Sequence, residues 1–180
     1  MSNRLTRQPL IGYPLAVPPR KSVVQAELQQ RRPFRSSAQE AAIALLRTAA
    51  VVRRSLARAV EPAGLSLAQY NVLRILRGAG SAGLPTLAIR DRMIEEASAI
   101  TRLVDKLERS GLVRRERSTP DRRQVICHAT PKALALLERL DPAADAADVA
   151  ATAMLSARER RELVRLLDAI RAGHRAEAAS

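Results

Sequence analysis

Aromatic side chains are scarce in this sequence: its 180 residues include no tryptophan, two tyrosines and one phenylalanine. Hydrophobic residues nevertheless make up 47% of the chain, so a core must be built from Ala, Leu, Val and Ile. Aromatic and β-branched residues are the ones that favour sheets, and this composition therefore favours packed helices over a β-sandwich. The length suffices for one domain with an arm but not for two large domains. We predict a mainly α protein.

Cysteine and long apolar runs are also nearly absent. Cys127 is the single cysteine, so no intramolecular disulfide can form, and a lone thiol fits a reducing compartment. No apolar run approaches the roughly 18 residues that a membrane-spanning helix needs. Prolines interrupt the N-terminal segment, which therefore lacks the unbroken apolar stretch of a secretion signal: Pro9, Pro14, Pro18 and Pro19. We expect a cytoplasmic protein with no membrane partner.

Patterns typical of enzymes and metal sites are missing as well. The two histidines, His128 and His174, are far apart, and one cysteine beside His128 does not complete a metal-ligand spacing. There is no glycine-rich phosphate loop, and no serine or cysteine is accompanied by a credible general base. The sequence therefore predicts no catalytic activity, no cofactor and no metal.

Positive charge, by contrast, is abundant. The chain has 31 Lys and Arg against 18 Asp and Glu, a net charge of +13, and nearly all the cations are arginine. Such an excess attracts polyanions, nucleic acid first and an anionic membrane surface second. Residues 1–37 hold seven basic residues and one acidic residue, which is typical of an arm, and residues 22–32 can form a short helix within it. The alternative is a disordered tail that only aids solubility.

Helical patterns begin where the arm ends. Residues 38–64 are rich in alanine and carry a helical apolar stripe that Pro62 and Gly64 terminate. Ser66 and Gln69 then form a capping box for a second, shorter helix. A third short helix begins at Pro85 or Thr86, and after a tight turn a fourth carries the apolar stripe Ile100, Leu103, Val104 and Leu107. Two short helices joined so closely predict a helix-turn-helix.

A predicted hairpin follows Gly111, which ends the fourth helix in a Schellman motif. The runs LVRRER and QVICHA flank the loop STPDRR, in which Pro120 cannot continue a ladder and Asp121 favours a turn. Thr130 and Pro131 then start a helix, which we expect to be interrupted at Asp141-Pro142 and to resume. A capping box of Ser156 and Glu159 begins the last helix.

This order of elements is that of a winged helix-turn-helix with a two-stranded β-hairpin wing. An α-helix fits the major groove of B-DNA, where base edges present distinct donors and acceptors. The narrow minor groove has a negative potential that attracts arginine. The paired arginines at the tip of the hairpin, Arg122 and Arg123, are therefore predicted to reach the minor groove.

The same residues resemble the MarR family of bacterial transcription regulators. The resemblance rests on the spacing of these residues, over about residues 38–172: Leu107, Gly111, Leu112, Val113, Asp121, Arg123 and Thr130. Ala129 stands where the family usually has leucine. The resemblance implies a homodimer joined through the first and last helices, with recognition helices in successive major grooves. It divides the chain into an arm (1–37), a dimerisation helix (38–64), a DNA-binding lobe (65–130) and C-terminal dimerisation helices with a tail (131–180).

The predicted fold assigns roles to specific residues. The polar face of the fourth helix and the hairpin tip are predicted to contact DNA through these residues: Ser98, Thr101, Arg102, Lys106, Arg122 and Arg123. Asp121 is predicted to brace an arginine within the wing, since a carboxylate near phosphates is repelled.

The resemblance also implies regulation by a ligand. Regulators of this family commonly repress transcription and release DNA when a small, often aromatic or phenolic, molecule enters a crevice beside the dimerisation helices. Tyr70 and Arg74 are the candidate effector-binding residues, although Tyr70 is an equally good core residue. Two alternatives remain: a winged-helix protein-interaction module, and a DNA-binding regulator that responds to no ligand.

Overall fold

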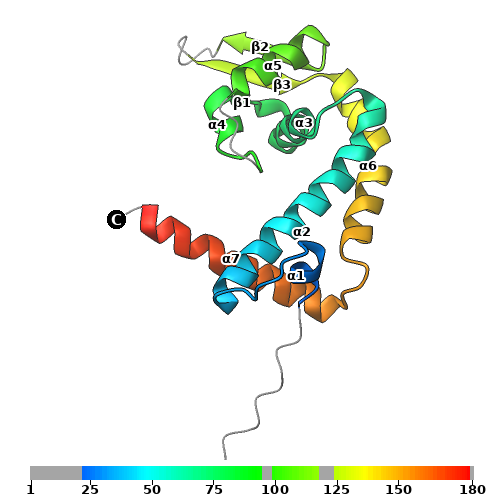
Figure 1. Cartoon of the computed structure of the whole chain (residues 1–180). Helices are drawn as coiled ribbons and strands as arrows, with labels where there is room; N and C mark the ends of the chain where they lie inside the picture. Colours follow the sequence, from blue (N-terminus) through cyan, green and yellow to red (C-terminus); the bar gives the residue numbers. More distant parts are fainter. Residues whose placement is uncertain (1–21, 95–98, 118–123, 179–180) are drawn as a thin grey trace, which may run out of the picture. The chain divides into compact units, whose positions relative to one another are not determined.

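We describe a computed structural model of the chain, in which residues 22–94, 99–117 and 124–178 are described. The chain divides into two compact units, Met1–Arg47 and Thr48–Ser180, and the division falls within the second helix. Figure 1 shows the elements of each unit. The fold is mainly helical, as the composition predicts.

The first unit contains a short helix that a glutamine side chain ties to the loop after it. Helix α1, Val23–Glu27, begins at Ser22, whose side chain accepts a hydrogen bond from the Gln25 backbone N–H. Gln25 is buried, and its side-chain amide donates to the carbonyls of Gln30 and Arg32. Part of the predicted arm is therefore a folded segment with its own hydrogen bonds.

Two helices with the predicted ends follow. Helix α2 spans Ser37–Val60 and leads into a single 3₁₀ turn, Glu61–Ala63, which Gly64 ends at φ +69°. Helix α3 spans Leu67–Ala79, and both hydrogen bonds of the predicted capping box between Ser66 and Gln69 are present. A second 3₁₀ turn, Gly80–Ala82, closes α3.

The predicted hairpin is confirmed, but it belongs to a three-stranded sheet. Strands β2 (Val113–Arg117) and β3 (Val125–Ala129) pair antiparallel, and β1 (Leu84–Pro85) adds to the other side of β3. The expectation of two strands was incomplete because β1 is only two residues long and contains a proline, so it lacks the alternation that marks a strand. Gly83 brings β1 close to β3: a Cβ there would lie 2.6 Å from the Cys127 carbonyl oxygen.

The helix-turn-helix packs against this sheet (Figure 1). Helix α4 spans Thr86–Arg90 and helix α5 spans Ile100–Arg109, and both contact α3 or the sheet. The core beneath them is aliphatic apart from one tyrosine and one cysteine, and its fully buried members include Val72, Leu73, Ile89, Val104, Leu107, Cys127 and Leu137.

Helix α6, Pro131–Ala151, is continuous, so the predicted interruption at Asp141-Pro142 is wrong. A proline within a helix removes one backbone hydrogen bond, but Pro142 lies on the exposed side. On the opposite side Leu137, Leu140 and Ala144 pack in the core both before and after it. This packing on either side of the proline accounts for the unbroken helix.

The last helix, α7, spans Ala157–Ala178. Its predicted capping box is present: Ser156 and Glu159 exchange backbone-to-side-chain hydrogen bonds of 2.8 and 3.3 Å. The Ser156 hydroxyl, which donates a 2.7 Å bond to the Glu159 carboxylate, and the Ser156 backbone N–H lower the pKa of that carboxyl because they stabilise its charged form.

Candidate DNA-binding surface

Helix α5 separates a buried face from an exposed one. Ile100, Val104 and Leu107 are buried and attach the helix to α3 and α4. Thr101 and Arg102 are exposed on the outer face. The helix is therefore held by its apolar stripe while its polar face is available to a partner, as the spacing predicts.

Described residues on both sides of α5 form hydrogen bonds with other elements. The side-chain carbonyl of Asn71 in α3 accepts a 3.0 Å bond from the backbone N–H of Ile94. At the other end Gly111, at φ +70°, donates to Glu108, and Leu112 donates to Leu107, which is the predicted Schellman motif. Thr130 then donates a 2.8 Å bond from its hydroxyl to the Gly111 carbonyl.

Arg115 on β2 joins the wing to helix α5. Its guanidinium forms an ion pair with Asp105 and a second, at 3.5 Å, with Glu108. Burial lowers the pKa of Arg115, but the hydrogen bond with Asp105 and the charge of Glu108 more than offset this and leave the pKa above its ordinary value. The strand that carries the wing therefore cannot turn relative to α5 without breaking these contacts.

The sequence reading missed this role of Arg115 and Asp105. The sequence predicts a role for neither residue, whereas in the structure the Asp105 carboxylate is turned towards Arg115 on β2. A signal was present, because two acids three residues apart near the end of a helix are followed, just past the glycine turn, by adjacent arginines. Choosing Arg115 rather than Arg114 as the partner requires the strand register, which places Arg115 opposite buried Cys127.

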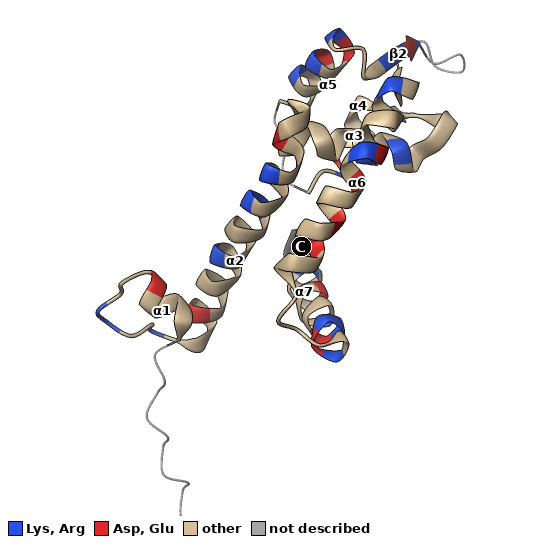
Figure 2. Ribbon diagram, turned by 90° about the vertical axis from the view of Figure 1, so that its right-hand side faces the viewer, with Lys and Arg blue, Asp and Glu red and all other residues tan. Residues whose placement is uncertain are grey.

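Unpaired positive charge gathers around α5 and β2. Figure 2 shows Lys and Arg on both elements. Among the residues that the structure describes, Arg102, Lys106 and Arg117 have no ion-pair partner. Arg114 is paired with Glu116 and so contributes less net charge. Arg109 of α5 also forms no ion pair among the described residues, so a polyanion would find four uncompensated cations on these two elements.

The predicted residues of the DNA-binding surface fall into three groups. Thr101 and Arg102 lie on the outer face of α5, while Lys106 lies on its flank and lines a pocket described below. Four predicted residues lie outside the described part of the chain: Ser98, Asp121, Arg122 and Arg123. Their roles at the helix start and at the wing tip stay predictions.

Tyr70 and Arg74, the predicted effector residues, lie on α3. Tyr70 belongs to the core and is 3% exposed, and the Arg74 guanidinium stands 5.7 Å from the centre of its ring. Burial raises the pKa of the Tyr70 hydroxyl, and the positive charge of Arg74 opposes this shift. Nearby, Arg77 forms a bidentate ion pair with Asp141, which joins α3 to α6. Their role in binding an effector stays a prediction.

The described residues hold neither a metal-type cluster nor a membrane-spanning helix. No cluster of three or more His, Cys, Asp or Glu side chains with the geometry of a metal site occurs among them. None of the helices they form has the length and apolarity required to cross a bilayer.

Comparison with known proteins agrees with the winged fold. The sequence pattern of the MarR family matches residues 65–125. An HTH-type transcriptional repressor from Mycobacterium tuberculosis is 32% identical over 124 residues, which are 69% of this chain and 88% of the repressor. The chain belongs to the MarR family. The family and the fold are those of transcription regulators rather than enzymes.

Several solved structures resemble this chain over most of their own length. A MarR transcription factor from Planctomyces limnophilus is 37% identical with a TM-score of 0.58, and the match covers 76% of this chain and 98% of that one. CouR from Rhodococcus jostii, solved bound to p-coumaroyl-CoA, is 26% identical with a TM-score of 0.66, and the match covers 76% of this chain and 95% of CouR.

One sequence relative is matched over a shorter part of its length. This Thauera aromatica protein, assigned to the regulation of the hcr operon, is 34% identical over 104 residues, which are 58% of this chain and 61% of that protein.

Proposed function

We propose that this MarR protein is a sequence-specific repressor that acts in the cytoplasm, binds a pseudo-palindromic operator in double-stranded DNA as a homodimer, and is released by a small-molecule ligand. The observation that carries this proposal is the construction of α5. Its apolar stripe is locked into the core, its outer face presents Thr101 and Arg102, and Arg115 ties it to the wing strand. A rigid polar helix flanked by a basic hairpin matches the shape and charge of a major groove with its adjacent minor groove.

Exposed apolar side chains support the homodimer. Helix α7 leaves its apolar stripe largely open to solvent, with Leu163 39%, Leu166 47% and Ile170 46% exposed. Val149 near the end of α6 is 68% exposed. Exposing this apolar surface to water is unfavourable in a monomer, whereas contact with a second copy of the chain would bury it.

Release by a ligand is supported by the relatives alone. CouR, one of the similar solved structures, holds p-coumaroyl-CoA. We propose that Tyr70 and Arg74 take part in the response of this chain, because a tyrosine ring beneath a guanidinium can stack on a flat ligand and pair with its charge. A ligand at this position would need Tyr70 to move out of the core.

The decisive experiment is selection of genomic DNA fragments by the purified protein, followed by affinity measurements on the selected sequence and on scrambled DNA. We expect one palindromic sequence to be enriched and to bind at least about 10³-fold more tightly than scrambled DNA at physiological salt. Affinity that depends steeply on salt but not on sequence would reject a specific regulator and favour a nonspecific basic module.

Two arginine variants assign the contacts. Replacing Arg102 with alanine should weaken binding to the selected sequence by about 1–3 kcal/mol and relax the base preference. Arg161→Ala on α7, which removes the same charge from another exposed position, should do neither. Arg123→Ala should weaken binding by a similar amount through the minor groove, with folding almost unchanged. Unchanged affinity in Arg123→Ala would mean that the hairpin tip is only solvated.

A further inference from the structure

A pocket on the flank of α5 has cationic side chains and an apolar floor. Its volume is about 320 Å³, within the range of small-molecule sites. Helices α5 and α6 and the start of α3 supply its walls. Ten residues line it and none is acidic, whereas Lys106, Lys132 and Arg139 contribute three positive charges. The predicted effector residues Tyr70 and Arg74 are not part of it.

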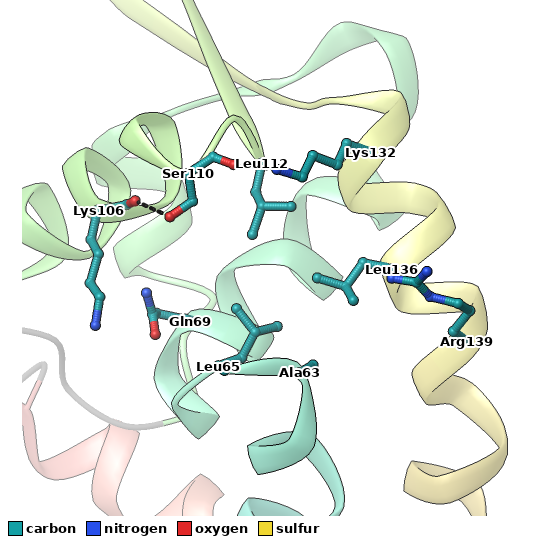
Figure 3. Close-up of a pocket in the computed structure, with 10 residues that line it drawn as sticks. Ala63, Leu65, Gln69, Lys106, Ser110, Leu112, Lys132, Leu136 and Arg139 are labelled. Atoms are coloured by element: carbon teal, nitrogen blue, oxygen red, sulfur yellow. Dashed lines mark hydrogen bonds between the residues drawn. The ribbon is translucent and has the colours of Figure 1, made fainter.

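The donors stand on two sides of an apolar strip. Figure 3 shows Lys106 and Gln69 on one side and Lys132 and Arg139 on the other, with leucine side chains between them. Leu65 and Leu112 are buried, and Leu136 packs against the core. A molecule lying along this strip would meet donors at both ends and carbon in the middle.

Most of these donors have unused hydrogen-bonding capacity. Gln69 is 3% exposed, and its side-chain oxygen accepts the Ser66 N–H, but within the described part of the chain nothing accepts a hydrogen bond from its Nε2 amide. Lys106 and Arg139 likewise have no ion-pair partner among the described residues. The Gln69 amide nitrogen is not among the fully buried unpaired atoms of the described residues, so it faces the pocket, and a free donor beside unpaired cations is an arrangement that an anion would complete.

Lys132 is the exception, because it already has a structural partner. Its ammonium group donates a 2.9 Å bond to the Ser110 carbonyl, at the end of α5. An ammonium has three donors, so this bond fixes the position of the charge and leaves two donors free. The pocket is thus built on a fixed connection between α5 and α6.

We propose that this pocket binds a small organic dianion that has an anionic group at each end of an apolar middle. One end pairs with Lys106 and the Gln69 amide, and the other with Arg139 and Lys132. A monoanion would leave one pair of donors unsatisfied, and a compact inorganic anion would leave the leucine strip uncovered. The site goes beyond DNA binding, since it needs neither an operator nor a partner subunit.

Calorimetric titration of the full-length protein, without DNA, tests the proposal. The probes are linear dicarboxylates from succinate to sebacate, which cover a range of end-to-end spacings, and the monomethyl ester of each, which keeps the chain and removes one charge. We expect one member of the series to bind at least about tenfold more tightly than its monomethyl ester, the factor expected for one charge-assisted hydrogen bond. The proposal fails if no dicarboxylate exceeds its own ester.

Three variants locate the binding. Arg139→Gln and Lys106→Gln should each reduce the advantage of the diacid over its ester to less than about twofold, while Arg161→Gln, an equal charge change on α7, should preserve it. Circular dichroism checks that each variant is folded, and the two pocket variants test the site independently. A diacid that binds equally well to all three would have another site. If no diacid binds and both pocket variants weaken DNA binding, these cations serve the DNA backbone and the proposal is overturned.

Discussion

The ion pairs of Arg115 lead to a prediction whose size can be worked out from the structure. Replacing Arg115 with glutamine removes its contacts with Asp105 and Glu108. The side chains of Arg115, Asp105 and Glu108 are 25%, 43% and 41% exposed, so solvent screens these pairs and each contributes on the order of 0.5–1 kcal/mol. The loss also leaves two acids three residues apart without a counterion.

A second effect acts in the opposite direction. The Arg115 Nε is buried and has no hydrogen-bond partner among the described residues, which costs about 1 kcal/mol or more in the native protein. Glutamine removes that donor, so the single variant should lose only about 1 kcal/mol of unfolding free energy. The coupling between Arg115 and Asp105, isolated by a double-mutant cycle with Asp105→Asn, should be about 1 kcal/mol in favour of the native pair.

Urea denaturation at one fixed protein concentration measures these free energies, since dimerisation would make stability depend on concentration. Arg114→Gln is the matched control, because it removes the same charge from the neighbouring, 57% exposed side chain, which forms an ion pair with Glu116 on the same strand. Arg114→Gln should lower the unfolding free energy by less than about 0.5 kcal/mol. A coupling energy near zero, or equal losses for Arg114 and Arg115, would refute the view that Arg115 holds the wing against α5.

Three further predictions concern other parts of the chain. Leu107→Ala should lower the unfolding free energy by about 2–5 kcal/mol, because this side chain is fully buried on the inner face of α5. A loss below about 1 kcal/mol in urea titration would contradict its role in the core. Gly83→Ala should cost about 1–3 kcal/mol, because φ is +62° and the new Cβ would lie 2.6 Å from a backbone carbonyl; thermal unfolding at the wild-type temperature would count against this. Removing residues 1–21, which carry four basic residues and no acid, should flatten the salt dependence of DNA binding without changing the preferred sequence, and an unchanged slope in salt titrations would give the segment another role.

Local chemistry explains why the ends of helices could be predicted. The capping boxes at Ser66 and Ser156 involve residues three apart, and the left-handed turn at Gly111 needs only a glycine after an apolar stripe. The hairpin is similar, because a proline and an aspartate between two short strand-forming runs leave few other conformations. Such features depend on residues that are close together in the sequence, so the sequence alone is enough to predict them.

Features that depend on distant residues could not be predicted. A two-residue strand such as β1 exists only because Gly83 allows close approach to β3, more than forty positions away in the sequence. Helix α6 continues through Pro142 because Leu137, Leu140 and Ala144 pack in the core on either side of it, a compensation that a propensity scale cannot include.

The DNA-binding surface likewise combines features that the sequence predicts with features that only the tertiary structure shows. The sequence by itself determined that α5 has an apolar stripe and an opposite polar face, since helical periodicity fixes which residues share a side. The arginines that it predicts at the hairpin tip lie outside the described residues. Only the tertiary structure decided that Asp105 pairs with Arg115 and that Lys106 faces a pocket. The reason is that an ion pair or a pocket forms where separate elements meet, and the angle at which α5 meets β2 and α6 is set by core packing rather than by any one segment.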